Sequence, residues 1–139
     1  MKIAVSACLL GENCKYNGGN NYSDKVIKFT KGHEVIPVCP EVLGGLPVPR
    51  EPAEIVNGTV SHRDGTSVDG EFRKGASLAL DIIKKNQVDL VILQSRSPSC
   101  GVNTIYDGTF SKTLIPGDGV FARLLKSNGI KIIDVNDLN

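Results

Sequence analysis

The stretch VDLVILQSRSPSCG, residues 88–101, joins an apolar run to a small-residue loop that carries a thiol. Val88 to Leu93 is apolar at nearly every position and lacks the alternation of a half-exposed strand, which is typical of a strand covered on both faces. Pro98 and Gly101 then favour a loop, and this loop places Cys100 shortly after the strand. The stretch therefore predicts a buried parallel strand whose carboxyl end is followed by a cysteine.

Three further segments share this apolar character: KIAVSA from Lys2, EVIPVC from Glu34 and IKIIDV from Ile130. Helical signals lie between the four segments, over residues 23–31, 69–86 and 120–128. Alternating strands and helices of this kind form parallel sheets with helices on both faces. We therefore predict an α/β chain, a single Rossmann-like three-layer domain over residues 1–139 with a mostly parallel sheet of about four strands.

The segment from Pro40 to Gly70 departs from this alternation. It contains four prolines, and its stretch EIVNGTVSHR, residues 54–63, predicts a hairpin that turns at Asn57-Gly58. Because the segment has too few apolar residues for a core of its own, we expect a small hairpin excursion beside the sheet.

Composition restricts the class of protein. A chain of 139 residues buries a sufficient core without disulfides, and 16 basic against 15 acidic residues, with no basic run, argue against long nucleic acid as a partner. The N-terminus lacks a secretory signal, and no stretch approaches the roughly 18 apolar residues of a membrane span. We expect a soluble cytoplasmic protein, a monomer or homodimer, whose cysteines are free thiols, metal ligands or catalytic groups.

Three of the four cysteines fall at the ends of predicted strands. Cys8 follows the first strand, Cys39 ends the second, and Cys100 follows the third, so all three are expected at the carboxyl edge of the sheet, where α/β proteins bind ligands. A single free cysteine is most often a small buried hydrophobe, but three at equivalent strand ends favour a shared site. Cys14 has no strand end beneath it, and we expect it to be an exposed or neighbouring thiol, with a role as fourth ligand as the alternative.

The chemistry of such a site is limited by the ligands available. Close cysteine pairs are absent, and His33 and His62 lie away from the strand ends, so a structural zinc site is disfavoured. An iron-sulfur cluster held by three cysteines, with one iron left open, fits better. The loop after Cys8 superficially resembles a phosphatase loop, but Cys14 and Lys15 stand where an arginine fork would be required. A structural metal- or cluster-binding module and a cluster-free cysteine enzyme, phosphatase or sulfur carrier, remain alternatives.

Four motifs together resemble the thiouracil desulfidase family over nearly the whole chain: SACLLGENCKYNG (6–18), PVCPEVLGGLPVPREPAEI (37–55), SPSCG (97–101) and IYDGTFSKTLIPGDGV (105–120). The resemblance implies a 4Fe-4S cluster held by Cys8, Cys39 and Cys100, with one iron not bound by protein. It implies a hydrolase-type reaction in which that iron takes sulfur from a thiolated pyrimidine, 2-thiouracil or a related thionucleobase or thionucleoside, leaving the oxo form and sulfide.

The resemblance also suggests an acid-base partnership of Glu41 with a serine of SPSCG, for which Ser97 is preferred and Ser99 held in reserve. Replacing C=S by C=O requires water to add to a ring carbon, so a carboxylate near the cluster is suited to deprotonate that water. The alternative for Glu41 is a structural carboxylate that accepts hydrogen bonds from nearby amides, and for the serines it is loop capping or hydrogen bonds to cluster sulfurs.

Further matched residues are expected to shape the substrate pocket: Tyr16, Gly44, Gly45, Arg50, Gly101 and Asp107. Tyr16 is suited to stack on a pyrimidine, and the glycines to close approach of backbone. Arg50 and Asp107 either orient the substrate or pair with each other. The chain reads Lys15-Tyr16-Asn17 where the family often reads Arg-Tyr-Asp, which leaves the exact substrate open.

Overall fold

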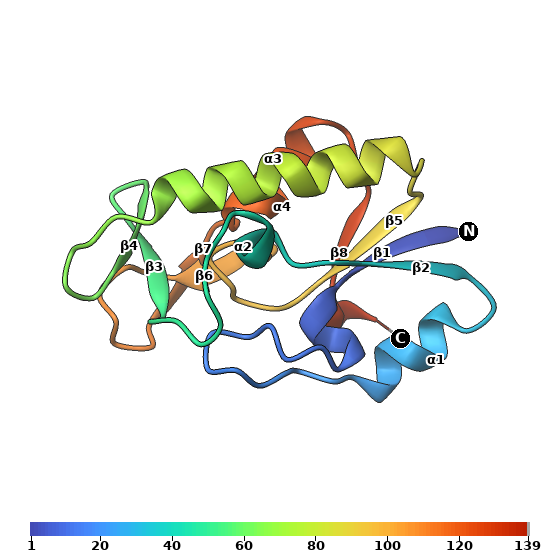
Figure 1. The fold of residues 1–139 in the computed structure, drawn as a ribbon, viewed down its shortest axis with the longest axis horizontal. Helices are drawn as coiled ribbons and strands as arrows, with labels where there is room; N and C mark the ends of the chain where they lie inside the picture. The colour runs from blue at the N-terminus through green and yellow to red at the C-terminus, as the bar shows by residue number, and fades with distance from the viewer. Residues whose placement is uncertain (139) are drawn as a thin grey trace.

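The computed structural model describes residues 1–138, and a parallel sheet of four strands lies at its centre (Figure 1). The strands follow the order β2-β1-β5-β8 across the sheet. Their bounds are Lys2–Ser6 for β1, Glu34–Val38 for β2, Leu90–Leu93 for β5 and Ile132–Asp134 for β8. These strands are the four apolar segments of the sequence, so the predicted parallel sheet is confirmed.

Helices cover both faces of this sheet. Their bounds are Asp24–Thr30 for α1, Pro40–Leu43 for α2, Asp69–Lys85 for α3 and Val120–Ser127 for α4, with 3-10 helices η1 at Ala7–Leu10 and η2 at Val135–Asp137. The three predicted helices are confirmed as α1, α3 and α4. Ser23 begins α1 by accepting a hydrogen bond from the Val26 amide at 3.3 Å. The short helices α2, η1 and η2 have too few residues to produce a periodic signal.

The alternation of side chains along the central strands explains the three layers. In β1, Ala4 packs into the core beneath α3 and α4, whereas Ile3 and Val5 pack into the opposite core with α1 and η1. In β5, Leu93 and Ile92 divide between the two cores in the same way. A strand that supplies both cores must be apolar at successive positions, which is why these segments show no polar alternation.

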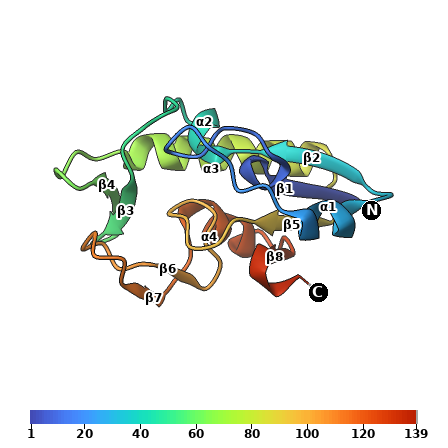
Figure 2. The same cartoon turned by 90° about the horizontal axis from the view of Figure 1, so that it is seen from below.

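Two antiparallel hairpins lie together at the end of the molecule opposite the N-terminus (Figures 1 and 2). The first pairs β3, Ala53–Val56, with β4, Thr59–His62, and turns at Asn57 and Gly58, both with positive φ, as predicted. The second pairs β6, Thr104–Tyr106, with β7, Leu114–Pro116, and was not predicted.

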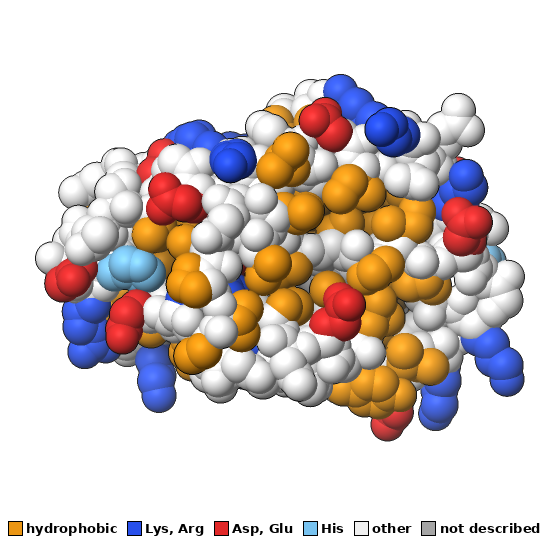
Figure 3. All heavy atoms as spheres, viewed as in Figure 1, with side chains coloured by type: hydrophobic (Ala, Val, Ile, Leu, Met, Phe, Trp, Pro, Cys, Tyr) orange, Lys and Arg blue, Asp and Glu red, His pale blue; other side chains and the backbone are white. Residues whose placement is uncertain are grey.

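The surface of the chain is mixed in character. On the face shown in Figure 3, charged side chains lie mainly around the outline and hydrophobic side chains gather in the centre. Among the helices of residues 1–138, none combines the length and the apolar composition needed to cross a membrane.

Candidate functional site

The carboxyl ends of β1, β2 and β5 meet at one edge of the sheet. Ser6 pairs with Val38, and Val5 pairs with Ile92, so the three strands end in register. The loops that follow carry Cys8, Cys39 and Cys100, and all three thiols line one cavity of about 470 Å³. This volume is in the range of small-molecule sites. Residues far apart in the sequence are thus brought together by parallel pairing.

The Cys39 loop is fixed against α3 by a pair of glycines. A Cβ on Gly44 would collide with the carbonyl oxygen of Glu71, and one on Gly75 would collide with that of Pro40. Cys39 is the N-cap residue of α2, so this close contact between α2 and α3 sets its position. Gly44 therefore permits backbone approach as expected, but the backbone it approaches is that of α3 rather than a substrate.

The Cys100 loop is fixed by the start of α4. The amides of Val120 and Phe121 donate to the carbonyl oxygens of Pro98 and Ser99 at 2.8 and 2.9 Å. These amides have no partner within their own helix, so the loop supplies the acceptors that the first turn needs. A Cβ on Gly119 would lie 2.5 Å from the Ser99 carbonyl oxygen, which explains the glycine there.

The environments of the three strand-end thiols differ. Burial raises the pKa of Cys100 to about 12, and it also raises the pKa of Cys8 against an opposing hydrogen bond from Asn21. The pKa of Cys39 is lowered to about 7, because the thiol of Cys14 donates to its sulfur and outweighs the cost of burial. Cys8 and Cys100 thus need a positive partner to be thiolates at neutral pH, as bound iron provides.

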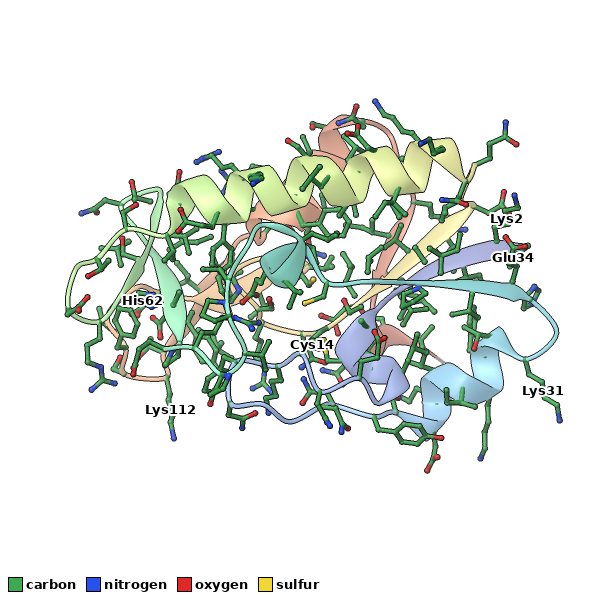
Figure 4. All side chains as sticks on the ribbon, in the orientation of Figure 1. Lys2, Cys14, Lys31, Glu34, His62 and Lys112 are labelled. Carbon is green, nitrogen blue, oxygen red and sulfur yellow. The ribbon has the colours of Figure 1, made fainter. Side chains whose placement is uncertain are left out.

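Cys14 lies in the loop after η1 and lines the same cavity (Figure 4). The hydrogen bond to Cys39 raises the pKa of the Cys14 thiol, so of the two sulfur atoms Cys14 keeps its proton. The structure therefore places Cys14 as a half-buried neighbour of a ligand candidate, rather than as a fully exposed thiol.

Glu41 is held in the cavity by two partners. Its Oε2 accepts a hydrogen bond from the Ser99 hydroxyl at 2.8 Å, and its Oε1 forms an ion pair with Arg50 at 3.1 Å. Only 6% of the Arg50 side chain and 15% of the Glu41 side chain are exposed. Arg50 also donates to the carbonyl oxygens of Cys14 and Pro47, which joins the loop after η1 to the loop after α2.

The two serines of SPSCG form a chain that leads to Glu41. The Ser97 Oγ accepts hydrogen bonds from the amides of Ser99 and Cys100, each at 3.1 Å, which leaves its own proton for the Ser99 Oγ at 2.9 Å. Ser99 in turn donates to Glu41. Ser99 therefore contacts the carboxylate directly, whereas Ser97, the serine preferred from the sequence, lies one hydrogen bond behind it.

The two hairpins supply further residues of the cavity lining, and none of these residues was predicted from the sequence as part of the site. They include Glu54, Arg63, Tyr106, Phe110 and Lys112. The Glu54 Oε1 accepts hydrogen bonds from the amides of Gly108 and Phe110 at 3.0 and 3.1 Å. Arg63 donates to the Phe110 carbonyl at 3.3 Å and lies 5.7 Å from its ring centre. The motifs EIVNGTVSHR and IYDGTFSK were visible in the sequence, but nothing in them indicated this contact.

Of the other residues predicted for the substrate pocket, some line the cavity and others do not. Tyr16 lines the cavity with 42% of its surface exposed, and its carbonyl accepts from the Arg50 amide. Of the two alternatives for Arg50 and Asp107, the pairing with each other is wrong, since Arg50 pairs with Glu41 and the Asp107 Oδ1 accepts from the amide and hydroxyl of Thr109. Within residues 1–138, the cavity lining does not include the following: Asp107, Gly44, Gly45, Gly101, His33 and His62.

Gly101 and Gly45 have local backbone reasons for being glycine. A Cβ on Gly101 would lie 2.7 Å from the Ser97 carbonyl oxygen, so the glycine allows the Cys100 loop to close on itself. Gly45 has a φ of +95°, in the left-handed region that side chains disfavour.

The donor set can be compared with the needs of different metal centres. In the part of the chain that the structure describes, no three His, Cys, Asp or Glu side chains surround a single metal-ion position. An iron-sulfur cluster makes a different demand, because each thiolate binds its own iron and the ligands stand farther apart. Three soft thiol donors around one cavity fit that demand.

Comparisons with known proteins agree with this arrangement. A family model for 2-thiouracil desulfurase matches residues 3–137. The uncharacterised protein YbbK of Bacillus subtilis (strain 168) is 42% identical over 147 aligned residues, which cover 99% of this chain and 97% of YbbK. A solved structure of the 4Fe-4S-dependent thiouracil desulfidase TudS is similar with a TM-score of 0.93 at 37% identity, over 99% of this chain and 92% of that chain.

Proposed function

This chain belongs to the 2-thiouracil desulfurase family, and from that premise we propose how its own residues carry out the reaction. The resemblance found in the four motifs is confirmed. The protein is an iron-sulfur-dependent enzyme that removes sulfur from a thiolated pyrimidine, giving the oxo form and sulfide. A purely structural metal module and a cluster-free cysteine enzyme are not favoured by these relationships.

The proposed cluster ligands are Cys8, Cys39 and Cys100. Their placement around one cavity at the carboxyl edge of the sheet is the observation that carries the proposal. The cluster is of the 4Fe-4S type, and we propose that one of its irons has no protein ligand, because the strand ends supply three thiols for four irons. When bound, the cluster supplies a Lewis-acidic iron that takes the departing sulfur.

Glu41 is the proposed general base. The overall reaction consumes one water and exchanges C=S for C=O with release of hydrogen sulfide, so no electrons are gained or lost. A carboxylate in the cavity takes a proton from water as it adds to the ring carbon. Arg50 holds the Glu41 Oε1 by an ion pair. The hydroxyl of Ser99 donates to the Glu41 Oε2 and is itself hydrogen-bonded to Ser97, so the two serines form a path by which a proton can be passed to or from the carboxylate.

The hairpins and the loop after η1 are proposed to hold the pyrimidine. Tyr16, Tyr106 and Phe110 supply aromatic rings on the cavity lining, and a planar base can stack on such rings. A stacked base would lie between these rings and the thiols, and water would reach its ring carbon from the side of Glu41. The cavity of about 470 Å³ must hold the cluster as well as the substrate.

The ligand set is tested by replacing each cysteine with serine and reconstituting each protein with iron and sulfide without oxygen. We expect Cys8→Ser, Cys39→Ser and Cys100→Ser to lose bound iron, visible absorbance and turnover of 2-thiouracil. Cys14→Ser is the matched control, since it changes a thiol in the same cavity, and it is expected to retain about four irons per chain. Iron retained with full turnover in Cys39→Ser, or lost in Cys14→Ser, would overturn this assignment.

A further inference from the structure

Each proposed ligand sulfur has a neighbouring side chain with a proton to donate. The Asn21 Nδ2 lies 3.5 Å from the Cys8 Sγ, and the Ser99 Oγ lies 3.6 Å from the Cys100 Sγ. The thiol of Cys14 is the corresponding neighbour of Cys39. Among these donors, Ser99 has a single proton and a closer acceptor in Glu41, and a thiol is a weak donor. Asn21 is the donor whose amide proton is directed at a ligand sulfur and has no competing acceptor among residues 1–138.

The backbone around Asn21 leaves its side chain little freedom. The Asn21 amide donates to the Cys8 carbonyl at 2.9 Å, and the Ser23 amide donates to the Leu9 carbonyl at 3.0 Å. Ser23 then begins α1 by accepting from Val26. Asn21 is thus tied to the residue whose sulfur it faces, and the segment after it is held by a helix.

The orientation of the carboxamide follows from the charge of the ligand. A thiolate bound to iron has no proton, so only the NH₂ side of the amide can face it attractively. A hydrogen bond to a cysteine sulfur stabilises negative charge on it, and such bonds are among the determinants of cluster reduction potential.

We propose that Asn21 is a positioning residue for the cluster, which orients Cys8 and stabilises electron density on its sulfur through the Nδ2–H···Sγ hydrogen bond. This inference rests on the proposed function, because it requires Cys8 to be a cluster ligand. Asn21 itself touches the ligand sulfur and takes no part in proton transfer. The side chain of Asn21 thus holds the Cys8 sulfur, and the cap that Ser23 forms on α1 holds the segment that carries Asn21.

The test is the reduction potential of the reconstituted cluster in Asn21→Leu, which keeps the approximate size of the side chain and removes the donor. We expect a potential more negative than that of the wild type, read by anaerobic spectroelectrochemical titration. Asn21→Asp, which replaces the donor with a negative charge, is expected to shift it further in the same direction.

The matched control is Asn20→Leu. Asn20 lies in the same loop, donates to the Asn13 side chain at 2.9 Å and accepts from the Tyr22 amide at 3.0 Å, so its loss disturbs the loop without removing a donor to sulfur. We expect the wild-type potential in this variant. An unchanged potential in Asn21→Leu, or an equal shift in Asn20→Leu, would overturn the inference.

A variant that fails to bind the cluster also tests the inference. An Asn21 variant that binds no cluster but whose metal-free form melts at the wild-type temperature supports the inference, because the amide is then needed for the cluster alone. A variant whose metal-free form is unfolded overturns it and makes Asn21 a folding residue. If the wild type binds no cluster, the proposed function fails first and this inference falls with it, which separates the two failures.

Discussion

The cavity has two walls that are held in place by different means. The thiol wall consists of Cys8, Cys39, Cys100, Glu41 and Ser99, on segments that directly follow the parallel strands. The segments of Cys39 and Cys100 pack against α3 and α4. The hairpin wall consists of Glu54, Arg63, Tyr106, Phe110 and Lys112, on the two hairpins beyond the sheet. The central strands are buried on both faces, whereas the hairpin strands are only partly buried and β7 is exposed.

The difference separates two tasks. A cluster and a general base need fixed positions, and the thiol wall supplies these from buried strands and tight backbone contacts. The two hairpins of the other wall are joined to each other by the polar contacts of Glu54 and Arg63, and we expect this wall to vary with less effect on the ligands. We therefore expect changes in the thiol wall to affect cluster content or turnover, and changes in the hairpin wall to affect substrate affinity.

The largest expected contrast lies within the thiol wall of the metal-free, reduced protein. The pKa of Cys39 is about 7 and that of Cys100 is about 12, so at neutral pH iodoacetamide should alkylate Cys39 faster by several orders of magnitude. The rate at Cys39 should rise with pH and reach half its maximum near pH 7, because the thiolate reacts. Peptide mapping by mass spectrometry measures this order, and equal labelling of Cys39 and Cys100 would contradict it.

Glu41→Gln should leave the cluster intact and lower kcat by about 100-fold or more, the usual contribution of a general base. The rate is followed by the loss of 2-thiouracil absorbance at matched iron content. Glu51→Gln is the control, since Glu51 is another carboxylate on the cavity lining and is not assigned a proton-transfer role. Equal losses in the two variants would show that only the charge of the cavity matters.

Ser99→Ala should lower kcat by about 10- to 100-fold, because a hydrogen bond to a charged group contributes about 1.5 to 3 kcal/mol. The variant removes the donor at 2.8 Å from the Glu41 Oε2 and keeps the ion pair with Arg50. The rate is measured with 2-thiouracil at matched iron content. An unchanged kcat would assign Ser99 to loop structure alone.

Glu54→Gln should raise KM about fivefold while kcat and iron content stay near the wild type. The neutral amide oxygen accepts more weakly from the Gly108 and Phe110 amides, at a cost of about 1 kcal/mol, and so loosens the hairpin wall. Steady-state kinetics with 2-thiouracil separate the two constants. A fall in kcat without a change in KM would contradict the division between the walls.

The sequence predicted the thiol wall more completely than the hairpin wall, and the reason is physical. Apolar runs such as Val88 to Leu93 identify buried parallel strands, and the order of such strands places their following residues at one edge. The hairpin of β6 and β7 has an exposed strand and is positioned by Glu54, which is distant in the sequence, so no local pattern indicated it.

The hydrogen-bond and ion-pair partners of the site residues also could not be predicted from local sequence patterns. Ser97 and Ser99 differ by two positions, and only the turn that Ser97 caps decides which hydroxyl reaches Glu41. The partner of Arg50 was likewise decided by the fold of the loop after α2, which brings Glu41 rather than Asp107 to it. The extent of a single domain over 1–139 and the oligomeric state stay predictions.

The central claim is that a cluster on the thiol wall desulfurates a thiolated pyrimidine by hydrolysis. The most direct measurement supplies 2-thiouracil to the anaerobically reconstituted wild-type protein, without any added electron donor, and quantifies uracil and sulfide. The account predicts equal amounts of the two products, and loss of both when a chelator removes the iron. A loaded cluster with no conversion, or conversion that survives removal of the iron, would contradict it.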